Sequence, residues 1–182
     1  MGDKYIKNSV PGSHGTIFYS ALFGSGYPTW DANATGMFLG LRSTTTKADM
    51  VRSVMEGITL ESRHILESVM AAGVQMQDVI TVTGGASKSP EWCQIIADIM
   101  GRTIRTLNVP DAAVIGAAGL AAIGAGLYKD LHEVVGNMVH FGETIAPIPE
   151  NVETYNKIFK IYKDSYYGLK STDVFTQLTA LQ

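Results

Sequence analysis

A short apolar run that ends in two glycines and leads directly into a helix start is the feature that most constrains the fold of this chain. Residues 78–83, Asp-Val-Ile-Thr-Val-Thr, are rich in β-branched side chains and almost wholly apolar, as is typical of a buried strand in a parallel sheet. Gly84 and Gly85 end the run, and Ser89 followed by Pro90 has the signature of a helix N-terminus. A strand that turns into a helix in this way predicts an α/β fold.

The segments on either side continue this alternation of strands and helices. Thr46 and Asp49 predict a capped helix start, an apolar helical stripe follows over residues 50–69, and Gly73 is expected to end the helix. The helix that begins after Ser89 is expected to end at Gly101. The other predicted elements are strands within residues 16–23, 36–41 and 103–107, a small-residue helix over 112–126, and two or three helices from Lys129 to the end, separated by Pro147-Ile148-Pro149.

Composition places the chain among folded proteins and argues against several classes of function. The 182 residues fit one domain, or one domain with a helical tail, and 46% of them are hydrophobic. A net charge of −3 without a run of Lys or Arg argues against nucleic-acid binding. The most apolar segment, residues 112–127, is interrupted by glycines and too short to span a membrane. The single cysteine, Cys93, and the lack of a signal-peptide pattern favour a cytoplasmic protein.

The turn over residues 83–89 is the strongest candidate for a binding site. Gly84 and Gly85 let the backbone approach a ligand with no Cβ in the way. The helix start offers unpaired N–H groups, and ligands of open α/β sheets bind at this end of the strands. The alternative is a tight strand-to-helix turn with a serine cap and no ligand, and the spacing alone does not decide between the two.

Two better-known phosphate motifs are absent. Lys88-Ser89 resembles the end of a P-loop, but Ser87 stands where that motif needs a glycine. The glycines between residues 116 and 126 lack the spacing of a dinucleotide-binding fingerprint. They predict a helix that packs closely on a sheet or on another helix.

The titratable side chains predict no catalytic centre. The histidines are scattered without ligand spacing, so no metal site is expected, and Cys93 is expected in the core. The carboxylates suit helix starts, turns and loops better than general-base catalysis, and no catalytic residue is assigned. The histidines are His14, His64, His132 and His140, and the carboxylates considered as a general base are Asp31, Asp49, Asp78, Asp98 and Asp111.

Five segments, taken in order, follow the pattern of one family. They are the loop Gly26–Gly36 with its Trp30-Asp31 pair, the helical segment Met55-Glu56-Gly57-Ile58 with Arg63, the run Thr83–Gly101, the small-residue segment Ala113–Ala118, and a tail with Pro147, Tyr155 and Tyr162. In this combination the chain resembles the C-terminal half of the FGGY family of sugar kinases over residues 16–169. The Trp-Asp loop is most similar to those of xylulose and gluconate kinases.

The resemblance implies an actin-like (ribonuclease H-like) ATPase domain that uses ATP and Mg²⁺. It implies that the adenosine of ATP rests on Gly84, Gly85 and Ala86, with Ser89 near the base. The family's N-terminal domain, which carries most sugar contacts and the catalytic aspartate, has no counterpart here. The Gly-Thr-Gly phosphate loop is also missing, because Ile17 follows Gly15-Thr16. The expected organisation is a domain incomplete at its N-terminus, with a nucleotide-side α/β core over 1–146 and a helical tail over 147–182.

The expected function is therefore the nucleotide-binding half of an ATP-dependent sugar kinase, inactive by itself. A xylulose-like sugar is favoured, and the sugar would be reached through the missing domain. Two alternatives stay open. One is a non-catalytic assembly module whose exposed cleft face would bind another subunit. The missing opening strands would leave an unpaired sheet edge, which a dimer would hide. The other is a small-molecule-binding domain unrelated to kinases.

Overall fold

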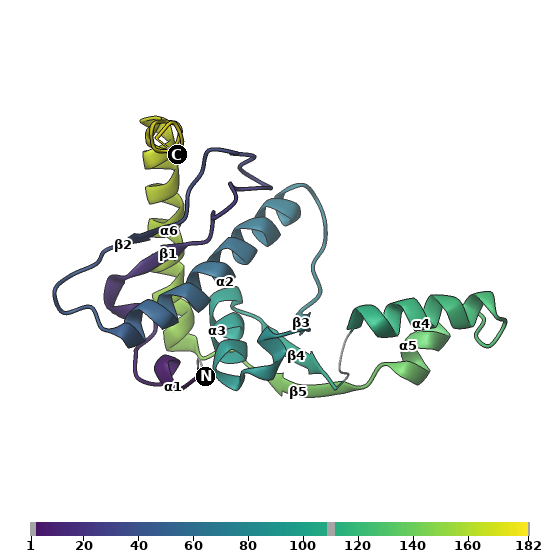
Figure 1. The fold of residues 1–182 in the computed structure, drawn as a ribbon. Coiled ribbons are helices and arrows are strands. Elements are labelled where there is room, and N and C mark those ends of the chain that lie inside the picture. The colour runs from purple at the N-terminus through teal and green to yellow at the C-terminus, as the bar shows by residue number, and fades with distance from the viewer. Residues whose placement is uncertain (1–2, 109–111, 182) are drawn as a thin grey trace.

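The computed structural model describes residues 3–108 and 112–181, and Figure 1 shows how their helices and strands are arranged. In chain order these are α1 (Asp3–Ile6), η1 (Ser13–Gly15), β1 (Ile17–Tyr19), β2 (Met37–Leu39), α2 (Lys47–Ala71), β3 (Val79–Val82), η2 (Ala86–Lys88), α3 (Pro90–Met100), β4 (Thr103–Leu107), α4 (Ala112–Gly124), α5 (Leu131–Met138), β5 (Phe141–Ile145), α6 (Pro149–Ser171) and α7 (Val174–Thr179).

The main core lies where α2, α3 and α6 meet β1. β1 and β2 form a separate two-stranded antiparallel sheet, with Ile17 opposite Leu39. The ring of Tyr19 stacks on that of Tyr162 from α6, with 4.6 Å between the ring centroids. Phe159 is also buried in this cluster. The predicted helical tail thus contributes to the same core as the earlier segments. The division of the chain into a core over 1–146 and a tail over 147–182 stays a prediction.

The second, three-stranded sheet has the order β3-β4-β5. β3 and β4 are parallel, as the sequence predicts, with Ile80 opposite Ile104. α3 covers one face of this sheet, where Cys93 and Ala97 are buried against Ile104. This parallel pair with its connecting helix is what places the glycine turn at the carboxyl end of β3.

The predicted helix boundaries in this region are confirmed. The Thr46 Oγ1 accepts a hydrogen bond from the Asp49 N–H at 3.1 Å, and the Asp49 carboxylate accepts one from the Thr46 N–H at 2.9 Å, which together form a capping box. Ser89 caps α3, Pro90 is its first residue, and Gly101 ends it in the left-handed conformation. Side chains close to each boundary make these contacts, which is why the sequence alone reveals them.

The prediction of helices throughout residues 129–182 is wrong for β5. Phe141–Ile145 form a strand that pairs antiparallel with β4, Ile104 lying opposite Ile145. Four of its five residues are exposed, so no alternation of buried and exposed side chains marks it in the sequence. Gly142 fits beside Thr106, whose Oγ1 would lie 2.5 Å from a Cβ at that position. Pairing with β4, not local preference, makes this segment a strand.

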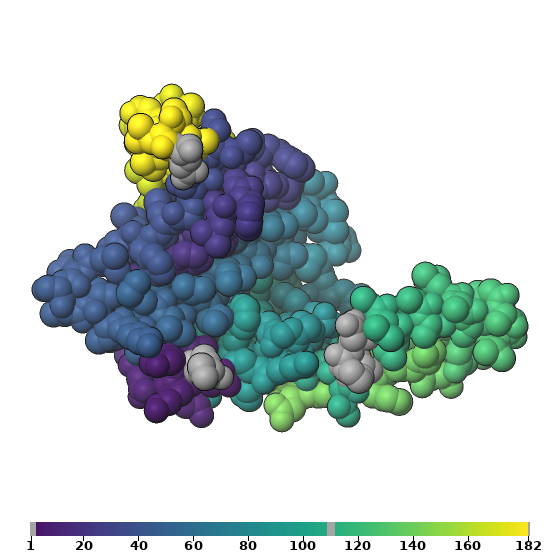
Figure 2. All heavy atoms as spheres, viewed as in Figure 1, coloured from purple at the N-terminus to yellow at the C-terminus, as the bar shows by residue number. Residues whose placement is uncertain are grey.

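α4 and α5 project from the rest of the molecule as a helical pair, seen in Figures 1 and 2 beyond the start of β5. Gly119 of α4 lies against Val134 of α5, and a Cβ at Gly119 would come within 2.4 Å of the valine Cγ1. The small-residue helix therefore packs on another helix, one of the two arrangements that the sequence predicts. Among the described helices, none combines the length and apolarity that a membrane span requires.

Candidate functional site

The glycine turn at the end of β3 presents an open backbone surface. Gly84 has a φ of +74°, which favours glycine, whereas Gly85 is in the ordinary right-handed helical region. A Cβ built at either position would meet no atom within 4 Å. Ser87 closes the turn, because its Oγ donates a hydrogen bond to the Gly84 carbonyl at 2.8 Å. The backbone at Gly84 and Gly85 is therefore open on the sides where a Cβ would lie.

Ser89 is already engaged on two sides. Its Oγ accepts a hydrogen bond from the Trp92 N–H at 3.1 Å, and it also donates to the carboxylate of Asp3 in α1. Glu91 lies in the first turn of α3 and pairs with Lys7 at 3.3 Å. The positive end of the α3 dipole thus has acidic groups beside it. The Ser89 hydroxyl is therefore already occupied by partners within the chain.

Two residues beside the turn, Asp3 and Cys93, hold it from within the protein. Asp3 contacts Ser89 across 86 positions of the chain, and no local signal could have revealed that contact. Cys93, which was expected in the core, is 1% exposed, and its thiol donates to the Ala86 carbonyl at 3.4 Å. Burial raises the pKa of this thiol, so Cys93 stays protonated and keeps its hydrogen bond to the Ala86 carbonyl.

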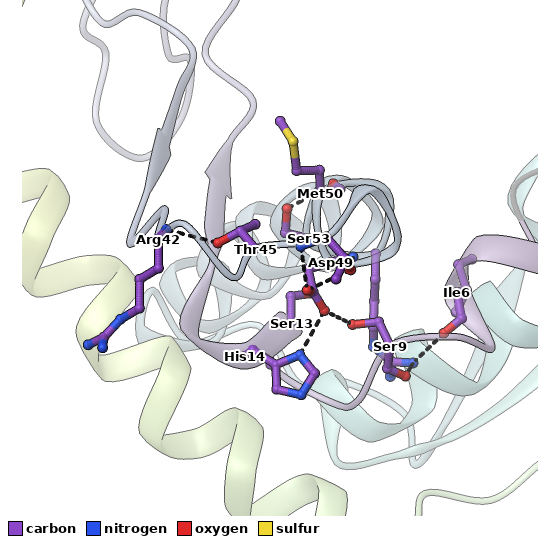
Figure 3. Close-up of polar contacts among 12 residues, drawn as sticks. Ile6, Ser9, Ser13, His14, Arg42, Thr45, Asp49, Met50 and Ser53 are labelled. Carbon is purple, nitrogen blue, oxygen red and sulfur yellow. Dashed lines mark hydrogen bonds and ion pairs between the residues drawn. The ribbon is translucent and has the colours of Figure 1, made fainter.

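Asp49 forms the centre of a polar cluster at the start of α2, drawn in Figure 3. Its carboxylate accepts hydrogen bonds from Ser9 at 2.5 Å and from Thr46, and the His14 Nδ1 lies 2.8 Å away. Burial would raise the pKa of this carboxyl, but the hydrogen bonds outweigh it and hold the pKa below its ordinary value. An ionised carboxylate with all these donors anchors the helix start and is not available as a base.

The remaining candidate carboxylates do not gather at the glycine turn either. Asp98 is buried and accepts hydrogen bonds from Gln94, from the Ile148 N–H and from Asn151, each at 2.8 Å, which ties the start of α6 to α3. Asp31 accepts hydrogen bonds from the Asn33 N–H and the Tyr166 hydroxyl and forms an ion pair with Lys170 at 3.5 Å. The Asp78 side chain is fully exposed and lies 3.6 Å from Arg102, and Asp111 lies outside the described residues. Across the described ranges 3–108 and 112–181, no group of three acidic, His or Cys residues could hold a metal ion.

Comparison with known proteins now decides the family. The model of the C-terminal domain of the FGGY family of carbohydrate kinases matches residues 4–125, which is more than half of the chain. The chain belongs to this family. The resemblance that the sequence suggests is thereby confirmed.

Relatives and solved structures agree with this assignment. The FGGY chain is 34% identical over 166 residues to the xylulose kinase of Staphylococcus xylosus, covering 90% of this chain and 34% of that protein. It superposes on the xylulose kinase of Lactobacillus acidophilus with a TM-score of 0.83 at 30% identity, covering 93% of this chain and 34% of the other. For the gluconate kinase of the same organism the TM-score is 0.81 at 30% identity, with 92% and 34% covered. The α/β fold is that of the actin-like FGGY C-terminal domain, and the chain spans about a third of the length of these relatives.

One histidine of this chain predicts that the free energy of unfolding depends on pH. His64 on α2 is 8% exposed, and its Nε2 lies 3.4 Å from the Tyr167 hydroxyl. Burial and, to a lesser degree, the nearby Lys163 lower its pKa, although Glu61 and Glu67 oppose this. The unfolded chain, with an ordinary histidine pKa of about 6.5, binds the proton more readily than the folded chain.

We therefore expect the free energy of unfolding to fall as the pH drops below 6.5, by at most about 1.4 kcal/mol per pH unit for this one proton. Urea unfolding between about pH 7 and pH 5, above the range where ordinary carboxylates titrate, measures the slope. His64→Gln should flatten it, while the same change at the exposed His132 should not. Equal slopes in the wild type and His64→Gln would contradict the assignment.

Proposed function

We propose that this chain forms the nucleotide side of an ATP-dependent sugar kinase, which transfers the γ-phosphoryl group of ATP to a sugar hydroxyl. The observation that carries the proposal is the open turn at Gly84 and Gly85, at the carboxyl end of a parallel strand in an FGGY-family chain. Ligands of open α/β sheets bind at this end of the strands, and nothing in the described structure covers the turn.

The adenosine, not the triphosphate, is the part of ATP that suits this turn. The Ser89 hydroxyl at the start of α3 is already held by Asp3 and by the Trp92 N–H, so it is not free to bind a phosphate. The backbone of Gly84, Gly85 and Ala86 instead offers uncharged groups for the adenosine. Mg²⁺ would arrive with the phosphates, whose charge it neutralises during phosphoryl transfer.

The sugar and the catalytic base would lie largely outside this chain. Several of its relatives are named xylulose kinase, which favours a xylulose-like substrate. Phosphoryl transfer requires that both substrates be positioned together and that the developing charge be stabilised. A chain that spans 34% of such a relative and offers no assigned base is expected to hold nucleotide without turning over.

Calorimetric titration of ATP with Mg²⁺ into the purified chain tests the proposal, with Gly85→Val as the variant. The wild type is expected to bind with a dissociation constant in the millimolar range or tighter. The valine places branched methyl groups over the turn and should weaken binding about tenfold or more. Because a Cβ at Gly85 meets no protein atom and the backbone there is right-handed, this variant should still fold.

Gly136→Val provides the matched control. Gly136 is an exposed residue of α5, a Cβ there also meets no atom within 4 Å, and it lies far from the turn in the sequence. It should bind ATP like the wild type. Binding that survives Gly85→Val unchanged would place the nucleotide elsewhere and contradict the proposed site.

A non-catalytic assembly module is the second candidate function, favoured by one observation. Among the strands that the structure describes, β3 pairs with β4 alone, so its other edge lies open next to the glycine turn, and such edges attract further strands. A chain that associates through this edge and gives no heat with ATP would support the module over the kinase half. A monomer that binds ATP at the turn would exclude it.

A further inference from the structure

Four polar side chains around the glycine turn already use their donor hydrogens within the chain. The pairs are the Ser87 hydroxyl with the Gly84 carbonyl at 2.8 Å, the Cys93 thiol with the Ala86 carbonyl at 3.4 Å, the Trp92 indole N–H with the Thr59 hydroxyl at 3.2 Å, and the Ser89 hydroxyl with the Asp3 carboxylate. From residue 84 to residue 93, the remaining side chain with a hydrogen to donate is Lys88, which is exposed to water. The side chains around the turn are therefore better acceptors than donors.

The contact with Asp3 fixes the direction in which the Ser89 hydroxyl can bond. A hydroxyl group has one hydrogen to donate and two lone pairs that accept. The Ser89 hydrogen is directed at Asp3, and one lone pair accepts the Trp92 N–H at 3.1 Å. The second lone pair can still accept a hydrogen bond from a ligand, but the hydroxyl has nothing left to donate. An ionised carboxylate such as that of Asp3 is likewise an acceptor only.

This pair of acceptors lies beside the residues proposed to carry the adenosine. The Ser89 N–H donates to the Ala86 carbonyl at 3.1 Å, so Ser89 directly follows the end of the turn. The side chains of Ser89 and Asp3 are partly buried, and neither is closed off from solvent. A partly buried acceptor forms a stronger hydrogen bond than one in water, and it loses more when the ligand offers no donor.

We propose that Asp3 and Ser89 make the site specific for a purine that carries an amino group at C6. This inference rests on the proposed function, because it assumes that a nucleotide occupies the turn. The amino group of adenine donates hydrogen bonds and suits the acceptors there. Hypoxanthine and guanine have an oxygen at C6, whose lone pairs would face those of Ser89 and Asp3 and leave them without a donor. Any backbone N–H of the turn that contacts ring nitrogens N3 or N7 would serve all these purines equally.

Calorimetric titration of the intact chain with ATP and with ITP, each with Mg²⁺, tests the proposal. The two nucleotides share the ribose and the triphosphate, so the ratio of their dissociation constants depends on the base alone. The wild type is expected to bind ATP about tenfold more tightly than ITP. Purine riboside triphosphate, which lacks the amino group but keeps N1 as an acceptor, should also bind more weakly than ATP. That result would separate the amino group from the change at N1 in ITP.

Asp3→Ala is expected to reduce the preference for ATP over ITP from about tenfold to less than about threefold. Without Asp3, the Ser89 hydroxyl is free to turn its hydrogen toward the oxygen at C6. Asp3→Asn should keep most of the preference, because the amide oxygen still accepts from Ser89. Glu91→Ala is the matched control, since it removes a carboxylate from the first turn of the same helix that pairs with Lys7. Its ratio should equal that of the wild type.

A purely structural role for Asp3 would weaken the binding of ATP and ITP together and leave their ratio unchanged. Equal affinity of the wild type for ATP and ITP, or an unchanged ratio in Asp3→Ala, would overturn the specificity proposal and leave the nucleotide site standing. If Asp3→Ala does not fold, Ser89→Ala removes the same acceptor and should likewise lower the ratio. A wild type that binds neither nucleotide would contradict the proposed function itself, and the specificity proposal would fail with it.

Discussion

Replacing Glu56 by alanine is expected to lower the free energy of unfolding by about 3–5 kcal/mol, the range found when one partner of a buried ion pair is removed. Glu56 is 3% exposed and accepts hydrogen bonds from the Arg52 Nε at 2.8 Å, the Tyr155 hydroxyl at 2.7 Å and the Gly12 N–H at 2.9 Å. Ser13 donates to its other oxygen at 2.8 Å. Alanine would leave a buried guanidinium and three further donors without their acceptor.

Urea unfolding followed by circular dichroism measures this loss. Glu67→Ala is the matched control, because Glu67 also pairs with an arginine four residues away on α2, at 2.9 Å from Arg63, but its side chain is 42% exposed. Such exposed pairs contribute up to about 1 kcal/mol. A loss at Glu56 as small as that at Glu67 would show that the buried network does not stabilise the fold.

Gly57→Ala is expected to destabilise the chain by at least about 1–3 kcal/mol, although alanine is the better helix former. Gly57 lies in the middle of α2 where the helix crosses β1. A Cβ at this position would come within 2.2 Å of the Phe18 carbonyl oxygen, a backbone atom that cannot turn aside. The helix would have to move away from β1 and open the main core.

Gly136→Ala in α5 is the control, because its Cβ would meet no atom within 4 Å. There the better helix propensity should raise the free energy of unfolding by about 0.5–1 kcal/mol. Thermal or urea unfolding of the two variants compares the same chemical change in two environments. Stabilisation by both alanines would mean that α2 does not approach β1 as closely as the structure shows.

These two residues also explain one of the motifs on which the resemblance rests. Glu56 and Gly57 belong to the segment Met55-Glu56-Gly57-Ile58. The structure gives them packing roles, since Glu56 binds the loop at Gly12 and Ser13 and Gly57 admits β1. The motif therefore identifies the fold of this region. It does not itself supply a ligand-binding group.

The sequence by itself determined the features that depend on neighbouring residues. The capping box at Thr46, the start of α3 at Ser89 and the left-handed stop at Gly101 are all made by side chains within a few positions of each other. The parallel β3–β4 pair follows from a strand, a turn and a crossover helix in sequence. The glycine turn was found for the same reason, and its role in binding nucleotide stays a proposal.

Only the tertiary structure decided what depends on residues far apart in the chain. β5 is a strand because β4 offers it an edge, and its own exposed side chains carry no strand pattern. Asp3 reaches Ser89, and Tyr155 reaches Glu56, across separations of 86 and 99 residues. Periodicity and capping rules depend on residues that are neighbours in the chain. Packing brings together segments that are far apart in the chain, and their order in the sequence does not predict how close they lie in space. The sequence thus identified the family and the turn, and the fold alone revealed the buried Glu56 network and the pairing of β5 with β4.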